Sequence, residues 1–141
     1  GNAVLVRMDV STGRLVKSTE ELIALYKPEP EDESKEKLPR LVPPKEFDAE
    51  VPVLLRRGDI DYNGHVHNAN YFTLALEAMP KELYEKRQIT AYRISYRSPI
   101  KESDVITAKL SADENSLLEC FFSSDGTLKT IVRLELSPTF L

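Results

Sequence analysis

Residues 61–71 read Asp-Tyr-Asn-Gly-His-Val-His-Asn-Ala-Asn-Tyr, and they bring several chemically useful groups together in a short span. The span begins with a carboxylate, an amide, a glycine and an imidazole, which belong to Asp61, Asn63, Gly64 and His65. An apolar helical pattern follows, so the positive end of a helix would lie beside two candidate proton acceptors. This suits attack on a carbonyl group, in which water loses a proton and negative charge grows on oxygen. The alternative is a purely structural turn, because Asp and Asn favour turns.

The sequence around this turn predicts an α+β fold. Residues 51–55 alternate as a strand does, and Pro52 indicates an edge position. Residues 70–86 have apolar side chains at helical spacing, and Pro80 should kink this helix or restart it as a second one. Alternating patterns predict four consecutive strands at residues 92–97, 105–110, 117–123 and 128–136, with Asp125-Gly126 as a hairpin turn. This order predicts an antiparallel sheet with one helix packed on its face.

The first 45 residues have a different character. Residues 3–8 alternate in the pattern of a short strand, and residues 11–13 form a turn after it. The next 40 residues offer this strand no partner. Ser18 and Glu21 have the spacing of a capping box and predict a short helix. Residues 27–45 are rich in proline and charge, which predicts a surface linker without core residues. We therefore divide the chain into residues 1–45 and a domain over residues 46–141.

Composition limits the possible functions of the chain. Its 141 residues, 41% apolar and 30% charged, are typical of a soluble globular domain. The net charge of −4 argues against a nucleic-acid partner, and no apolar run approaches the roughly 20 residues of a membrane span. The single cysteine, Cys120, predicts a reducing, cytoplasmic environment and a buried packing role. Two histidines and one cysteine make a zinc site improbable.

The turn and its flanking pattern resemble the hot-dog fold thioesterases. The likeness is carried by residues 57–71 (RGDIDYNGHVHNANY) and 77–80 (EAMP). The best match is to the acyl-ACP thioesterases of bacteria and plants, which have tandem hot-dog repeats and a similar Asp-x-Asn-x-His motif in the second repeat. The resemblance implies an antiparallel sheet wrapped around a central helix. It also implies that residues 1–45 are the end of a preceding repeat and the linker that follows it.

The resemblance further implies that this protein releases free fatty acids from acyl carrier protein by thioester hydrolysis in fatty acid biosynthesis. The expected catalytic residues are Asp61, Asn63 and His65. Asn63 would position a water that His65 or Asp61 deprotonates; alternatively, Asp61 attacks the carbonyl group directly. This chemistry requires no metal and no other cofactor.

Backbone N–H groups at Gly64, or at the start of the following helix, are the expected oxyanion donors. Tyr71 and Phe72 are expected to contact the substrate. His67 is expected to be a surface or helix-entry residue outside the chemistry, and the helix N-cap is expected at Asn68 or Asn70.

One departure from the family keeps other functions open. Plant members carry a Glu-Cys pair where this chain has Pro99 and Ile100, and Glu102 lies close to that position. The alternatives are a single-domain acyl-CoA thioesterase and a non-catalytic half that binds acyl chains or completes a dimer. The expected partners are an acyl carrier protein or coenzyme A thioester, together with a second copy or an upstream repeat as a pseudo-dimer. Basic residues available for an acidic carrier protein are Arg56, Arg57, Arg87, Arg93, Arg97 and Lys101.

Overall fold

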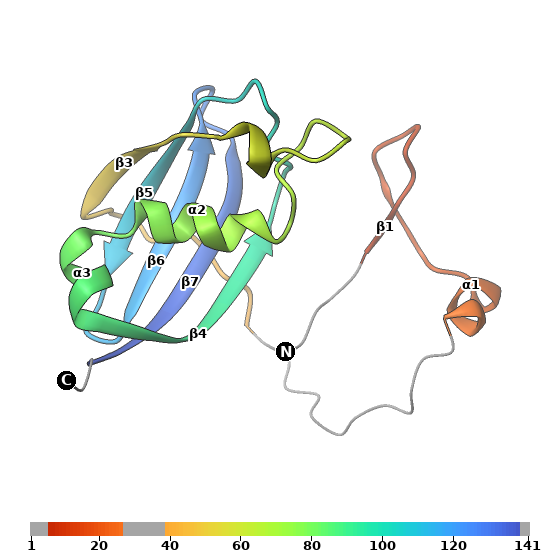
Figure 1. The fold of residues 1–141 in the computed structure, drawn as a ribbon. Helices are drawn as coiled ribbons and strands as arrows, with labels where there is room; N and C mark the ends of the chain where they lie inside the picture. The colour runs from red at the N-terminus through yellow and green to blue at the C-terminus, as the bar shows by residue number, and fades with distance from the viewer. Residues whose placement is uncertain (1–5, 27–38, 139–141) are drawn as a thin grey trace. The chain divides into compact units, whose positions relative to one another are not determined.

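The computed structural model describes residues 6–26 and 39–138 (Figure 1). The chain divides into two compact units, residues 1–38 and 39–141. In the described part of the chain, no helix combines the length and the apolarity that crossing a membrane requires.

The first unit contains a small hairpin and a short helix. β1 (Arg7–Met8) pairs antiparallel with β2 (Leu15–Val16), so the expectation that the first strand lacks a nearby partner is wrong. Asp9 makes this pairing possible, because its Oδ1 accepts hydrogen bonds from the backbone N–H groups of Ser11 (2.8 Å) and Thr12 (3.0 Å) in the turn. Residues 3–5 of the predicted strand lie outside the described residues.

The short helix begins one residue later than the predicted capping box implies. α1 (Glu20–Leu25) has Thr19 as its N-cap, and the Thr19 hydroxyl accepts a hydrogen bond from Leu22 N at 3.3 Å. Thr19 replaces Ser18 in this role because its backbone is extended while its side chain reaches the N3 amide. No described side chain of β1, β2 or α1 is buried.

The second unit is built on a five-stranded antiparallel sheet (Figure 1). Its strand order is β3-β5-β6-β7-β4, with β3 (Ala49–Val53), β4 (Arg87–Tyr96), β5 (Ile106–Ala112), β6 (Ser116–Ser123) and β7 (Leu128–Pro138). The edge position that Pro52 predicts for β3 is confirmed. The four predicted consecutive strands are confirmed as β4 to β7, but β4 pairs with β7 and not with β5, its neighbour in the sequence. This pairing places β4 at the second edge of the sheet.

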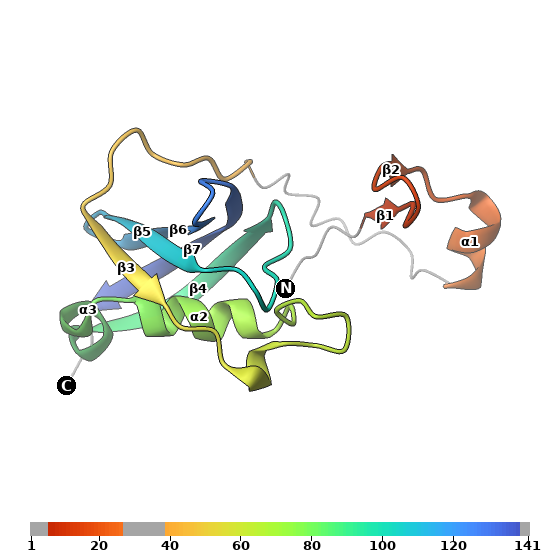
Figure 2. The same cartoon turned by 90° about the horizontal axis from the view of Figure 1, so that it is seen from above.

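Two helices follow β3, and the first crosses one face of the sheet (Figure 2). α2 (Asn70–Ala78) and α3 (Lys81–Lys86) are separated at Pro80, which is the N-cap of α3. The predicted restart of the helix is therefore confirmed. α2 buries four side chains against the sheet, from Tyr71, Leu74, Ala75 and Ala78. They share one core cluster with residues of β5, β6 and β7, among them Ala108, Leu117, Phe121, Val132 and Leu134.

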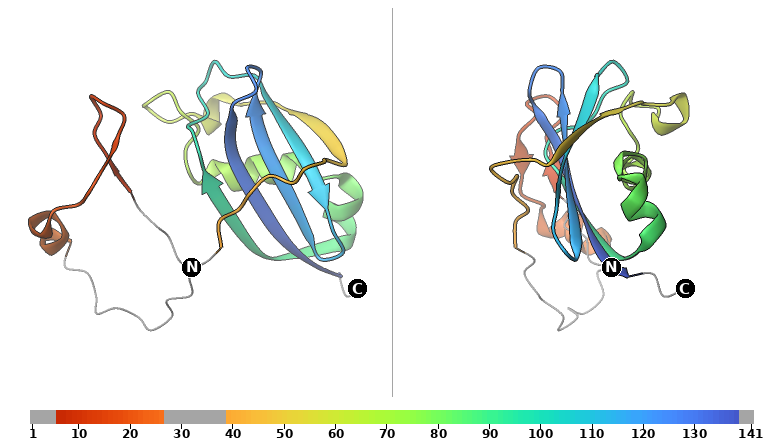
Figure 3. Two further views of the ribbon diagram at one scale, coloured as in Figure 1. Left: turned by 180° about the vertical axis from the view of Figure 1, so that it is seen from behind. Right: turned by 90° about the vertical axis from the view of Figure 1, so that its left-hand side faces the viewer.

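A second, smaller core covers the opposite face of the sheet. Figure 3 shows the segment before β3 crossing that face, away from α2. Leu41 of this segment is 8% exposed and packs with Cys120 and Ile131. The expectation that residues 27–45 contain no core residue is therefore wrong for Leu41, although residues 27–38 lie outside the described residues. Cys120 is fully buried, and its predicted packing role is confirmed.

Candidate functional site

The predicted site lies on the connection between β3 and α2, and its turn is closed by one side chain. Asp61 Oδ1 accepts hydrogen bonds from the backbone N–H groups of Asn63 (2.8 Å) and His65 (3.2 Å). Asp61 N donates to His65 O at 2.7 Å, and Gly64 N donates to Asp61 O at 3.0 Å. Gly64 has a φ of 74°, a left-handed conformation that glycine adopts without strain. The sequence therefore needs glycine here to close the turn.

These hydrogen bonds also determine the charge state of Asp61. Partial burial opposes its negative charge, but the backbone N–H groups of His65 and Asn63 outweigh this effect and lower the pKa of Asp61. A carboxylate with a lowered pKa is a weaker base. Asp61 is therefore better suited to holding Asn63 and His65 in place than to removing a proton.

The turn packs against residues 97–104, which connect β4 to β5. His65 and Lys101 face each other in an isolated antiparallel bridge. Glu102 N donates to Gly64 O at 3.1 Å, and Val66 N donates to Ile100 O at 2.8 Å. An open depression of about 510 Å³ lies between these segments, lined by Asn63, Gly64, His65, Lys101, Glu102 and Ser103. The structure thus brings Asn63 and His65 to one surface, with Asp61 supporting them from within the turn.

The start of α2 is the better source of oxyanion donors. Gly64 N already donates to Asp61 O. Within the described residues no side chain caps α2, whose N-cap is Ala69, so the N-cap roles predicted for Asn68 and Asn70 are wrong. His67 explains this difference, because its backbone O accepts from Asn70 N (2.8 Å) and its Nδ1 accepts from Ala69 N (3.2 Å). Uncapped N–H groups in a first helical turn can stabilise negative charge.

Tyr71 and Phe72 lie in different surroundings at the start of α2. Tyr71 is 3% exposed, and its hydroxyl oxygen accepts a hydrogen bond from Ile100 N at 3.2 Å. Its ring packs edge-on against Tyr96, with centroids 5.0 Å apart, and burial raises the pKa of Tyr71. Phe72 is half-buried and packs against Tyr92, with centroids 4.5 Å apart. Tyr71 is thus placed to anchor α2, and Phe72 remains the more accessible of the two predicted substrate contacts.

Several supporting residues were missed by sequence reasoning. Asp59 is 3% exposed and pairs with Arg56, with Oδ2 and Nε 3.3 Å apart, while its backbone O accepts from His67 N at 2.8 Å. The i, i+3 spacing of Arg56 and Asp59 is the feature of the sequence that could have predicted their ion pair. Asp104 pairs with Lys129, but these residues are 25 positions apart, and nothing local in the sequence indicates their contact.

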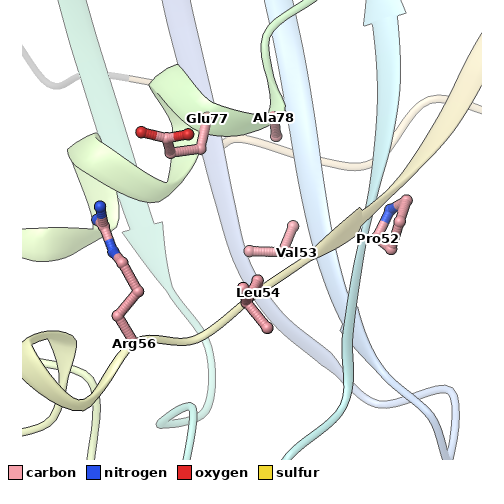
Figure 4. Close-up of a pocket in the computed structure, with 6 residues that line it drawn as sticks. All are labelled: Pro52, Val53, Leu54, Arg56, Glu77 and Ala78. Carbon is pink, nitrogen blue, oxygen red and sulfur yellow. The ribbon is translucent and has the colours of Figure 1, made fainter.

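A second depression lies between β3 and the end of α2 (Figure 4). It has a volume of about 190 Å³ and is lined by Pro52, Val53, Leu54, Arg56, Glu77 and Ala78. This is below the roughly 300–1,000 Å³ of sites that enclose small molecules. None of the predicted catalytic residues lines it, so it does not compete with the depression beside His65.

Residues 44–130 match a known protein family, described as the acyl-ACP thioesterase C-terminal domain. The chloroplastic oleoyl-acyl carrier protein thioesterase 2 of Arabidopsis thaliana is 26% identical to this chain over 148 residues. The match covers 96% of this chain and 40% of that protein.

The fold of this chain is also similar to those of solved thioesterase structures. The 12:0-ACP thioesterase from Umbellularia californica has a TM-score of 0.76 at 20% identity, over 94% of this chain and 53% of that chain. An acyl-ACP thioesterase from Bacteroides thetaiotaomicron has a TM-score of 0.69 at 20% identity, over 92% and 53% of the respective chains. These similarities confirm the predicted hot-dog fold. This chain spans about half, or less, of the length of these three proteins.

Proposed function

Because this chain belongs to the acyl-ACP thioesterase C-terminal domain family, we propose that it supplies the catalytic residues of an acyl-ACP thioester hydrolase. The observation that carries the proposal is the position of Asn63 and His65. Both line one depression, and the turn that holds them leads directly into the uncapped α2. Such a site combines a proton acceptor, an amide that can orient water and N–H groups for an oxyanion.

The proposed reaction uses water as the nucleophile. The Asn63 amide orients the water, and the His65 imidazole removes its proton as oxygen adds to the carbonyl carbon. N–H groups at the start of α2 stabilise the oxyanion. When the C–S bond breaks, the imidazolium returns its proton to the thiolate. Asp61 keeps its charge and holds the backbone of Asn63 and His65 throughout.

The surroundings of Cys120, and the residue at the position of the family's cysteine, both favour water as the nucleophile. Ile100, at the position of the family's cysteine, is fully buried and donates its backbone N–H to Tyr71. Cys120 packs in the cluster on the face of the sheet opposite α2. Burial, followed by the charge of Glu119, raises the pKa of the Cys120 thiol to about 11. A thiol with such a pKa holds too little thiolate at neutral pH to act as a nucleophile.

Lys101 is the best candidate for contact with an acidic carrier. It is exposed and lines the depression. Three of the other basic candidates are already engaged: Arg56 pairs with Asp59, while Arg93 and Arg97 donate hydrogen bonds to the backbone O atoms of Pro39 and Leu41. The contact with the carrier is therefore limited to a small basic surface around Lys101. The net charge of −4 also disfavours a broad basic docking surface.

Hydrolysis of matched long-chain acyl-ACP and acyl-CoA thioesters by the full-length natural protein tests this proposal. We expect release of free acid from acyl-ACP, with a higher kcat/KM than from acyl-CoA. Faster hydrolysis of acyl-CoA would favour the coenzyme A alternative. Binding of acyl-ACP without hydrolysis of either substrate would contradict the proposal and favour a non-catalytic half.

A further inference from the structure

Residues 97–104, named here the wall segment, form one side of the depression beside His65. Lys101, Glu102 and Ser103 of this segment line the depression opposite Asn63–His65. The segment contains no helix and no strand of the sheet, and its isolated bridge at Lys101 pairs with His65 of the turn. Its position relative to His65 therefore depends on individual hydrogen bonds and ion pairs.

Three backbone N–H groups join the wall segment to the catalytic turn and to the start of α2. Glu102 N donates to Gly64 O (3.1 Å), Val66 N donates to Ile100 O (2.8 Å) and Ile100 N donates to the Tyr71 hydroxyl oxygen (3.2 Å). Any shift of the wall segment would thus be transmitted to the residues on either side of His65.

On its other side, the wall segment is held by Lys129 near the start of β7. Lys129 Nζ lies 2.9 Å from Asp104 Oδ2 and donates to Pro99 O at 3.3 Å. Lys129 O accepts hydrogen bonds from Arg97 N (2.9 Å) and Ser98 N (3.0 Å). Both ends of the segment therefore attach to this one lysine.

The ion pair itself is largely shielded from solvent. The side chains of Lys129 and Asp104 are 9% and 18% exposed, and Asp104 Oδ2 also accepts a hydrogen bond from Lys101 N at 2.9 Å. Partial burial opposes the charge of Asp104, but the hydrogen bonds from Lys101 and Lys129 outweigh it and lower the pKa of Asp104. Removing one partner of such a pair leaves a poorly solvated charge, in contrast to most surface pairs.

We propose that Lys129 and Asp104 are positioning residues, which hold the wall segment against the catalytic turn. The wall segment then places the thioester carbonyl correctly relative to the His65 imidazole. The proposal rests on the proposed function of this site. A displacement of about 1 Å at a reacting centre can cost about 10²-fold in rate. The pair therefore acts on turnover through the wall segment, without contact with the reacting atoms.

Kinetics of the full-length natural protein test this role, with Lys129→Met as the main variant. We expect kcat for acyl-ACP to fall about 10²-fold with KM nearly unchanged, and Lys129→Arg to recover most of the loss because it keeps the ion pair. Asp104→Asn, which is nearly isosteric, should reproduce the loss even if Lys129→Met folds poorly. The matched control is Lys109→Met, which removes a pair with Glu50 (2.7 Å) on β5 and β3 and should leave kcat unchanged.

Amide hydrogen exchange of Glu102 and Val66 separates positioning from general destabilisation. In Lys129→Met we expect faster exchange at these two amides than in the control, with exchange in the centre of β7 preserved. An unchanged kcat in folded Lys129→Met, or a loss accompanied by equally faster exchange throughout β7, would overturn the inference. A wild-type protein that hydrolyses no thioester would overturn the proposed function instead, because the exchange comparison does not require turnover.

Discussion

Glu119 shows how one side chain can oppose the packing that surrounds it. It is fully buried on the central strand β6, opposite Leu110 and Val132 of the neighbouring strands. Leu117 and Phe121 lie two residues away on the same strand and pack in the α2 cluster, so Glu119 faces α2 as well. Neither of its carboxyl oxygens has a hydrogen-bond partner among the described residues. Desolvation raises the pKa of Glu119 to about 9.

This environment predicts an unusual pH dependence of stability. Between pH 4.5, the ordinary pKa, and pH 9, the folded state keeps the proton that the unfolded chain releases. The unfolded state binds fewer protons, so the free energy of unfolding falls as pH rises, by up to about 1.4 kcal/mol per pH unit. Urea unfolding from pH 5 to 8 measures this slope. Glu119→Leu should remove it and add roughly 1–3 kcal/mol at pH 7, whereas the exposed Glu114→Leu should keep the slope.

The roles within the turn give a second prediction at the scale of single residues. His65→Ala should lower kcat for acyl-ACP by about 10²–10⁴-fold, as expected for a lost general base, and Asn63→Ala should also impair turnover. Asp61→Asn keeps an oxygen that can accept from Asn63 N and His65 N, so a small loss is expected. His67→Ala is the control, because the exposed His67 side chain accepts a hydrogen bond from Ala69 N and, among the described residues, from no other group; this substitution should affect stability more than turnover. A His65→Ala protein with wild-type kcat would contradict the assignment of the base.

At the scale of elements, the turn before α2 depends on backbone conformation more than on space. A Cβ at Gly64 would meet no atom within 4 Å, but its φ of 74° lies in the left-handed region. A Cβ at Gly58 would also meet no atom within 4 Å, but the φ of Gly58 is not positive. The two glycines therefore form a matched pair that separates backbone strain from steric crowding.

The third prediction uses this pair. Gly64→Ala should lower the free energy of unfolding by about 1–2 kcal/mol, the cost of a left-handed non-glycine residue. Gly58→Ala should be neutral or stabilise by up to about 1 kcal/mol, since it restricts the unfolded chain. Urea unfolding of both variants measures the difference. Equal stabilities would show that the turn accommodates the added methyl group of Gly64→Ala without strain.

At the scale of the whole molecule, the two edges of the sheet differ. β3 is short and contains Pro52, whereas β4 spans ten residues without proline. Proline and short strands protect sheet edges against pairing, so β4 is the less protected edge. Tyr92 on β4 is 56% exposed. These features favour association along β4, with a second copy or with a preceding repeat.

The last prediction concerns this edge. The chain by itself should sediment as a dimer at micromolar concentration, and Tyr92→Lys should shift it toward monomer by placing like charges across the interface. Tyr84→Lys is the control, because Tyr84 on α3 has a similar exposure of 60%. A monomeric wild-type chain, or equal effects of both substitutions, would contradict pairing through β4.

Local patterns in the sequence determined most of the elements of this protein. Periodicity located α2 and the strands of the five-stranded sheet, Pro80 located the restart of the helix, and the positive φ at Gly126 fits the Asp-Gly hairpin signal. The Asp61–His65 turn was also predictable, because the residues that close it lie within five positions of one another.

Tertiary structure alone decided the contacts between distant residues. The pairing of β4 with β7, the burial of Leu41 behind the sheet and the contact of Lys129 with Asp104 each join segments that no local pattern connects. The physical reason is that periodicity and turn propensity depend on neighbouring residues, whereas strand order and buried ion pairs depend on which surfaces meet when the chain folds.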